Sequence, residues 1–386
     1  MKKSVKKFLT LLLCFSVLFT LMNLSVLADS FEEQIVPQMY AKDQIEEIAA
    51  TPDELNRWNA NTKIEDEIIL YDIHDNPNGY VYTLSTDGAE TGFIQFDYLD
   101  GVYQLHSYAF SGQNEVIYLR ERWSKENNAP VPGKIYYLGS MAYAVKVEDH
   151  FVDLISSDVV TLSEAELAEE YAKQVKRRLT PQSRAAANGS KNVVNYNKFT
   201  PVTMDDFQGR VVKDGHASTV MDHCTPTAGT NVMKYYDLCR GQTKLFIDDW
   251  STFSRMYLAM DTNSVTSPSK IRSGTYWDIT HSDGYSGLLN YANQRGAPSS
   301  DTYRYALGAV TGIKMSSITE QIDKNHPVMI SVQGFPGAAG GGSSYHSVVV
   351  FGYDNDKILV NNGWTTDFIY YNYNSLAVHE YYYIGY

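Results

Sequence analysis

The hydrophobic pattern divides the chain into an apolar leader, a stretch rich in strands, and a stretch that mixes helices with strands. Residues 8–27 are apolar almost throughout and follow a lysine-rich start. From residue 68 the pattern alternates, and Asp100-Gly101 between two alternating runs indicates a hairpin. The predicted strands are 68–73, 80–84, 92–99, 102–108, 116–120, 134–137, 142–147 and 151–155.

A capped helix and an irregular segment close this strand-rich part. Ser163-Glu164-Ala165-Glu166 is a capping box, and apolar residues continue at helical spacing up to Lys176-Arg177-Arg178. Residues 179–193 show no periodicity, which favours an exposed linker open to proteases. The prediction for residues 29–178 is therefore an antiparallel sheet followed by a helix.

The third stretch, residues 194–386, begins its regular structure with a well-marked helix. Pro226 suits a first helical turn and Gly241 suits the residue after the end. Between them, Ala228, Val232 and Tyr235 share one face with Cys239. A second capping box at 317–320 predicts a short helix, 334–342 is a glycine-rich loop, and strands are expected at 328–332, 346–353, 357–362, 368–373 and 381–386. This pattern predicts an α+β domain.

The N-terminal segment predicts that the protein is exported from the cell. A basic start, an apolar stretch and a small residue at Ala28 predict a secretory signal peptide over residues 1–28. Its removal takes away four lysines and changes the net charge from −13 to −17. Nucleic acid is not expected as a partner of so acidic a chain. No later segment is long and apolar enough to span a membrane, so no stable insertion is expected after signal cleavage.

Two cysteines remain in the exported chain, Cys224 and Cys239. Fifteen residues along one helix separate them by about 22 Å, whereas a disulfide needs Cα atoms within about 7 Å. Cys224 is therefore predicted to be a free thiol. At a helix N-terminus, unpaired N–H groups and the macrodipole favour a thiolate, so the position suits a nucleophile. A buried structural cysteine is the alternative.

A cysteine nucleophile needs a base and a group that orients the base. His346 begins a buried strand after the glycine-rich loop, and Asn362 ends the partner strand, so a hairpin can bring them side by side. Asn361 points to the opposite face. Trp364 shares the face of Asn362 and can shield the Asn–His contact from water. We predict that Cys224 and His346 form a thiolate–imidazolium pair.

The order of these residues resembles papain-like cysteine peptidases of the bacterial secreted kind, closest to the streptopain family and to the peptidase domains of bacteriocin exporters. The matching segments are Cys224 with 226–228, 322–332, 345–353 and 360–364. The resemblance implies a papain-like domain over 194–386, with the cysteine on an N-terminal helix and histidine and asparagine on a C-terminal antiparallel sheet. It also implies a protein or peptide substrate. More weakly, residues 29–178 are similar to the β-rich inhibitory propeptide of streptopain-like zymogens.

Two positions depart from the papain-like pattern. Ser218 lies where such enzymes usually carry the glutamine of the oxyanion hole, and His223 replaces the usual glycine before the cysteine. Gln208 is the first candidate for the missing glutamine and Gln333 the second.

Three functions remain open from the sequence. The first is a secreted cysteine endopeptidase made as a zymogen, with residues 29–178 as an intramolecular inhibitor. The second is a cell-wall amidase on a papain-like fold, and the third an inactive surface-binding module, suggested by the missing glutamine. No cofactor is implied, and no metal site is predicted because the nine histidines are scattered and Asp354-Asn355-Asp356 indicates a turn.

Overall fold

The computed structural model describes residues 37–179, 189–210, 222–263, 265–267, 270–271, 275, 283–306, 313–337 and 343–386. The predicted signal peptide, Ser218 and most of the predicted linker lie outside the described residues. Residues 1–60 form one compact unit and residues 61–386 another. In the first unit, residues 37–49 are helical, and the Asn56 side-chain amide donates to the Ile48 carbonyl at 3.1 Å.

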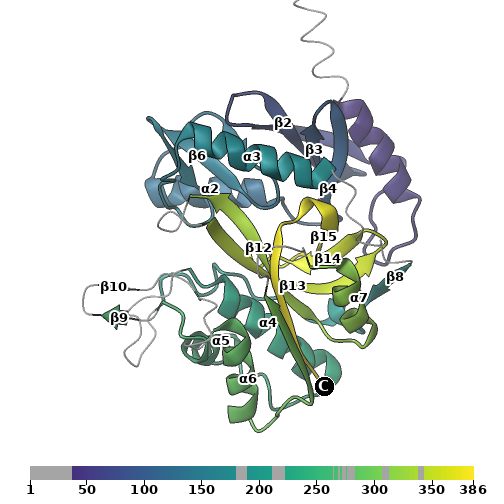
Figure 1. Ribbon diagram of the computed structural model, residues 1–386. Helices are drawn as coiled ribbons and strands as arrows, with labels where there is room; N and C mark the ends of the chain where they lie inside the picture. The colour runs from purple at the N-terminus through teal and green to yellow at the C-terminus, as the bar shows by residue number, and fades with distance from the viewer. Residues whose placement is uncertain are drawn as a thin grey trace, which may run out of the picture. The chain divides into compact units, whose positions relative to one another are not determined.

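The N-terminal region, residues 61–179, is a twisted sheet with two helices (Figure 1). Its strands are β1 (Lys63–Tyr71), β2 (Pro77–Thr86), β3 (Ala89–Leu99), β4 (Val102–Ala109), β5 (Ile135–Tyr137), β6 (Tyr143–Val147) and β7 (His150–Asp153). Strands β1 to β4 form an antiparallel meander, and β5 adds to β1 in parallel. The β3–β4 turn has Asp100 and Gly101 both at positive φ, 51° and 81°, which confirms the predicted hairpin.

The two helices of this region are α2 (Glu115–Asn127) and α3 (Glu164–Leu179). The capping box of α3 is confirmed, since Glu166 Oε2 accepts from the Ser163 N–H at 2.8 Å. The strand predicted at 116–120 is wrong, because these residues form the first turns of α2. Asn114 caps this helix by accepting from the Val116 N–H at 2.8 Å, and a local cap of this kind outweighs the β preference of Val116 and Ile117.

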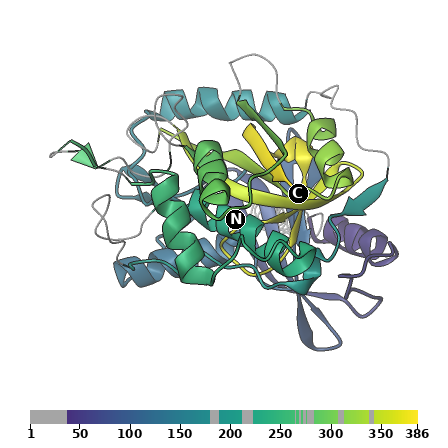
Figure 2. The same cartoon turned by 90° about the horizontal axis from the view of Figure 1, so that it is seen from below.

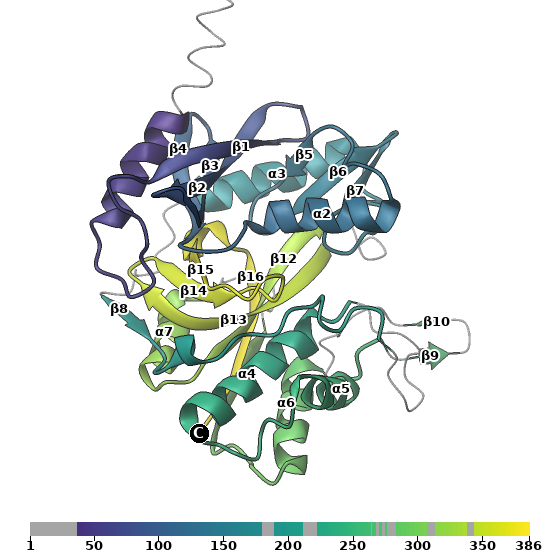
Figure 3. The same cartoon turned by 180° about the vertical axis from the view of Figure 1, so that it is seen from behind.

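The C-terminal region, residues 189–386, packs helices against its part of the sheet, and most of them gather on one side of it (Figures 2 and 3). The helices are α4 (Cys224–Arg240), α5 (Asp249–Ala259), α6 (Gly284–Gln294) and α7 (Met315–Asp323), with short 3-10 turns at Tyr196–Lys198 and Tyr373–Ser375. The strands are β8 (Ser190–Asn192), β9 (Val265–Ser267), β10 (Lys270–Ile271), β11 (Asp301–Ala306), β12 (Val328–Pro336), β13 (Ser343–Asp354), β14 (Lys357–Asn361), β15 (Ile369–Asn372) and β16 (Val378–Gly385). The predicted helix and strands near the C-terminus are thus present, with shifted ends.

Three boundaries differ from the sequence prediction. The end of the predicted linker is strand β8, which pairs with Gly352–Asp354 of β13. Helix α7 begins at Met315, so Ser317 lies inside it and the predicted capping box does not mark its start. Strand β12 continues to Pro336, because Pro336 still pairs with Ser343 beyond an irregularity in the register. The rest of the predicted glycine-rich loop, 338–342, lies outside the described residues.

One sheet runs through both regions. Its order is β11-β16-β12-β13-β14-β15-β4-β3-β2-β1-β5-β6-β7, with β8 attached to β13. The regions meet where Tyr370 and Tyr371 of β15 pair with Tyr108 and Ser107 of β4. Phe335 of β12 also belongs to the hydrophobic cluster of the N-terminal region, 6.2 Å from the Phe151 ring centroid. The N-terminal region is thereby fixed to the strands that carry the predicted site.

Candidate active site

Helix α4 presents Cys224 at its first position, as the sequence predicts. The preceding residue, His223, occupies the N-cap position and makes no side-chain capping bond. The His223 side chain therefore does not cap the positive end of the helix, where Cys224 lies. Gly241 ends the helix at φ 75°, and both Cys224 and Cys239 are free thiols.

Cys224 lies against β13 through Ser347, the residue that follows His346. The backbone N–H and the hydroxyl of Ser347 both act on the Cys224 sulfur, and the Ser347 hydroxyl is 2.8 Å from that of Thr225. Burial raises the pKa of the Cys224 thiol, and the donors from Ser347 and Thr225 offset part of this rise. Helix α4 thus brings the predicted nucleophile to strand β13, the strand that also carries the predicted base, His346.

The imidazole of His346 is clamped by the turn at 362–364. Its Nε2 lies 2.6 Å from the backbone carbonyl oxygen of Asn362. The Trp364 indole stacks on the ring with centroids 3.9 Å apart and planes 6° apart. Trp364 is 2% exposed and His346 is fully buried, so the indole shields the histidine as the sequence predicts.

The clamp fixes which nitrogen of His346 carries the proton. A carbonyl oxygen only accepts hydrogen bonds, so Nε2 carries the proton and the lone pair is on Nδ1. Among the described residues Nδ1 has no hydrogen-bond partner, so it is free to act as a base. Burial and, to a smaller extent, the positive charge of Arg122 lower the pKa of His346 to about 4, although the hydrogen bond to the Asn362 carbonyl opposes this shift. Near neutral pH this state contains a neutral thiol and a neutral imidazole, so the thiolate–imidazolium pair remains a prediction.

The side chains of Asn362 and Asn361 contact different parts of the molecule. The Asn362 side-chain oxygen accepts from the Trp364 N–H at 3.0 Å, and its amide lies 3.4 Å from the Tyr371 hydroxyl. Its side chain therefore shapes the turn, while its carbonyl contacts the histidine. Asn361 faces α4, where its Oδ1 accepts from the Asn231 side chain at 3.0 Å. The two residues point to opposite sides, as the strand alternation requires.

A turn formed by residues 203–209 lies beside both halves of the site. The Met204 carbonyl accepts from Nε2 of His223 at 2.9 Å, and the Met204 N–H donates to the Gly363 carbonyl at 2.7 Å. Gln208 lies at the exposed end of this turn. Burial lowers the pKa of His223 to about 4, so this histidine is neutral and acts as a donor to the turn.

The second oxyanion candidate lies elsewhere. Gln333 of β12 pairs with Tyr345, whereas the cross-strand neighbour of His346 is Val332. Successive strand residues point to opposite faces, so the side chains of Gln333 and His346 diverge. Of the two candidates, Gln208 lies on the turn that contacts His223, whereas the Gln333 side chain points away from His346, so Gln208 is the better candidate. Its role as the oxyanion donor remains a prediction.

Sequence reasoning did not single out Ser347 or Met204. Ser347 could have been found as a polar residue in the apolar run that follows His346, at a buried strand position. Met204 acts through its backbone, so no side-chain pattern could mark it.

The Peptidase_C39-like family matches residues 190–385. The chain belongs to the Peptidase_C39-like family. This peptidase also resembles, at 16% identity and a TM-score of 0.31, the structure of active wild-type Prevotella intermedia interpain A cysteine protease, over 53% of this chain and 97% of that chain. No curated protein matches the sequence.

As a member of this family, the protein is a cysteine peptidase, a hydrolase. Among its described residues no group of three or more histidine, cysteine or acidic side chains is arranged to hold a metal ion. No helix in the described part of the chain is long and apolar enough to cross a membrane.

Proposed function

We propose that the protein is a secreted bacterial cysteine endopeptidase of the streptopain-like kind, made as a zymogen. Cys224 attacks the substrate carbonyl as its proton moves to Nδ1 of His346, and His346 then protonates the leaving amine. Water hydrolyses the resulting thioester and regenerates the thiol. Asn362 orients the imidazole, and Gln208 with the Cys224 N–H holds the oxyanion.

The proposal that the uncut chain is inactive is supported mainly by one contact between the two regions. The Tyr118 hydroxyl of α2 donates to Asp205 at 2.6 Å, and Asp205 belongs to the turn at 203–209 that contacts His223 and Gly363. The N-terminal region thus holds the turn that connects the two halves of the site. In the same helix, the charge of Arg122 disfavours protonation of His346, which an active ion pair requires.

Further contacts attach the N-terminal region close to the same strands. The Ser111 hydroxyl donates to Asp367 at 2.7 Å, and Thr161 donates to the Gly337 carbonyl through both its N–H and its hydroxyl. An inhibitory propeptide is expected to bind the catalytic domain in several places that separate together after cleavage.

The test compares the purified full chain with its Cys224→Ala variant on two substrates, casein and purified cell wall. We expect the wild-type chain to release a fragment of roughly half its mass and to hydrolyse casein as that fragment accumulates, while the variant stays uncut. Hydrolysis of cell wall without hydrolysis of casein would favour an amidase. Activity toward neither substrate would favour a binding module.

The position of the cut is constrained by the elements on either side of the linker. Helix α3 extends to Leu179, and Arg178 near its end is 6% exposed and paired with Asp97 at 2.7 Å. Strand β8 begins at Ser190 and pairs within the peptidase sheet. A cut between Leu179 and Ser190 keeps both elements intact, so we expect the N-terminus of the fragment in that interval. Full activity of the uncut chain would contradict the inhibitory role.

A further inference from the structure

The side chain of Asn362 connects the catalytic clamp to a second strand. Its Oδ1 accepts from the N–H groups of Trp364 and Thr365, at 3.0 and 3.4 Å, and so fixes the turn whose carbonyl accepts the hydrogen bond from Nε2 of His346. Its amide points the other way, to the hydroxyl of Tyr371 on β15 at 3.4 Å. Tyr371 therefore contacts the group that holds the histidine, although it does not contact the histidine itself.

Tyr371 lies at the junction of the two regions. It pairs with Ile358 of β14 on one side and with Ser107 of β4 on the other. Its side chain is fully buried, and its ring meets the ring of His106 edge-on, with centroids 5.9 Å apart and planes at 90°. Both neighbours on the β4 side belong to the N-terminal region, so that region determines the surroundings of Tyr371.

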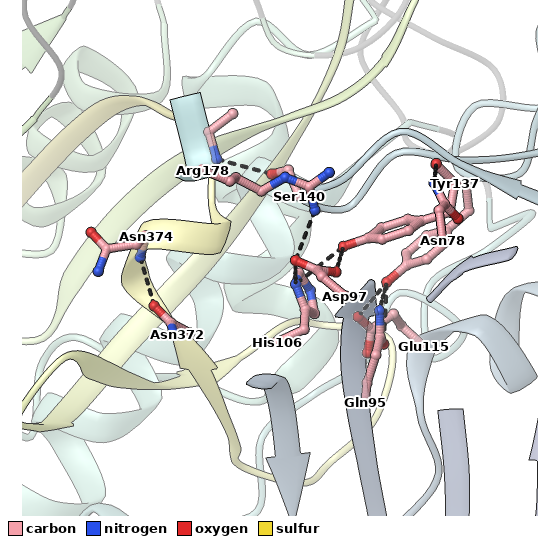
Figure 4. Close-up of polar contacts among 12 residues, drawn as sticks. Asn78, Gln95, Asp97, His106, Glu115, Tyr137, Ser140, Arg178, Asn372 and Asn374 are labelled. Atoms are coloured by element: carbon pink, nitrogen blue, oxygen red, sulfur yellow. Dashed lines mark hydrogen bonds and ion pairs between the residues drawn. The ribbon is translucent and has the colours of Figure 1, made fainter. Parts of the chain in front are cut away.

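The Tyr371 hydroxyl also interacts with Glu115, the first residue of α2. Glu115 is fully buried and accepts from the Tyr143 hydroxyl at 3.0 Å. Figure 4 shows Glu115 beside Gln95 in the buried polar network that also contains His106 and Asp97. A tyrosine hydroxyl is both donor and acceptor, so Tyr371 can accept from the Asn362 amide and still has a proton to offer to an acceptor on the other side. Glu115 Oε2 is buried without a hydrogen-bond partner among the described residues.

We propose that Tyr371 is a positioning residue for His346, acting through the Asn362 turn, and that the buried Glu115 of the N-terminal region influences its hydroxyl in the uncut chain. Release of the N-terminal region removes Glu115, His106 and Ser107 from Tyr371 and leaves the contact with Asn362. Loss of the hydroxyl therefore loosens the clamp in both forms, whereas loss of the Glu115 carboxylate acts only on the uncut chain. This inference rests on the proposed zymogen.

The kinetic test uses Tyr371→Phe in the processed enzyme. We expect kcat on a peptide substrate to fall about threefold to tenfold, the effect of one neutral hydrogen bond, with KM changed less than twofold. Tyr370→Phe is the matched control, because Tyr370 precedes it on β15 and stacks on Tyr108 instead. An unchanged kcat, or a change in KM alone, would overturn the inference.

A second measurement does not depend on activity. In the full Cys224→Ala chain labelled with 15N-histidine, the His346 signals are identified by their loss in a His346→Gln variant. We expect Tyr371→Phe and Glu115→Gln each to reduce the population protonated at Nε2, while Glu115→Gln leaves kcat of the processed enzyme unchanged. If wild type shows no peptidase activity, the proposed function fails while the nuclear magnetic resonance result still decides the positioning role. Unchanged His346 signals in both variants would refute that role.

Discussion

Replacing Tyr118 by phenylalanine removes one hydrogen bond between α2 and the turn that precedes Cys224. The Tyr118 side chain is 7% exposed, and its hydroxyl donates to Asp205 at 2.6 Å. A hydrogen bond to a charged group contributes about 1.5–3 kcal/mol. Because Asp205 is exposed and water competes for it, about 1–1.5 kcal/mol is expected. At about 1.4 kcal/mol per tenfold, the open population of the uncut chain rises about fivefold to tenfold.

The assay is alkylation of Cys224 by iodoacetamide in the uncut chain, followed by mass spectrometry. When opening and closing are faster than labelling, the labelling rate is proportional to the open population. Cys239, at the far end of α4 and half-buried, serves as the internal reference. We expect the Cys224 to Cys239 rate ratio to rise about fivefold to tenfold in Tyr118→Phe.

Asp205→Asn should raise the same ratio, because it removes the charge that strengthens the bond. The double variant should show little more than either single variant, since the two changes remove one interaction. If the ratio stays within twofold of wild type in both single variants, α2 does not restrict access to Cys224 and the reasoning is refuted.

Three further predictions concern other buried groups. Ser347→Ala removes a hydroxyl that acts on Cys224, so alkylation of Cys224 should require higher pH and kcat of the processed enzyme should fall about threefold to tenfold; unchanged pH dependence would contradict the contact. Burial raises the pKa of Asp153 to about 6, so its contribution to stability is present below about pH 4 and lost as pH rises through about 6. Asp153→Asn should therefore stabilise the uncut chain at pH 7.5, by up to about 3 kcal/mol, and much less at pH 4, as read from thermal unfolding. Asp97→Ala leaves the Arg178 guanidinium buried without its partner and should cost about 3–5 kcal/mol of unfolding free energy, part of which Asp97→Ala with Arg178→Met should restore.

The parts of the fold that carry local signals were predictable from the sequence. Pro226 and Gly241 mark the two ends of α4 through their own backbone preferences, and Asp100-Gly101 specifies its hairpin turn. The β13–β14 hairpin also follows from alternation and brings Asn362 close to His346. The elements that carry Cys224, His346, Asn362 and Trp364 are therefore ones that local sequence specifies.

The contacts that hold the site in this state were not predictable in the same way. The sequence pattern suggested the Asn362 side chain as the partner of His346, whereas the partner here is the Asn362 carbonyl. The identity of residue 362 does not tell in which direction its backbone carbonyl points, so this contact could not be read from the sequence. Strand 116–120 was a wrong prediction for a related reason, since the cap from Asn114 outweighs the β-branched residues that follow it. The pairing of Tyr371 with Ser107 joins positions far apart in the sequence and has no local signal.

The main-chain pairing between the two regions is short, which suits the proposed release of the N-terminal region. Strand β4 pairs with β3 from Phe93–Ala109 to Leu99–Val102, but with β15 only at Tyr370–Tyr108 and Tyr371–Ser107. Strand β15 keeps its own pairing with β14 from Lys357–Asn372 to Val360–Ile369. Release of the N-terminal region therefore breaks a short main-chain contact and leaves each sheet otherwise paired. It also leaves β15 as a short edge strand, and short edges give other chains little to pair with. The same short pairing places Tyr371 in contact with both regions, so separation at β15 changes the surroundings of the residue that holds Asn362.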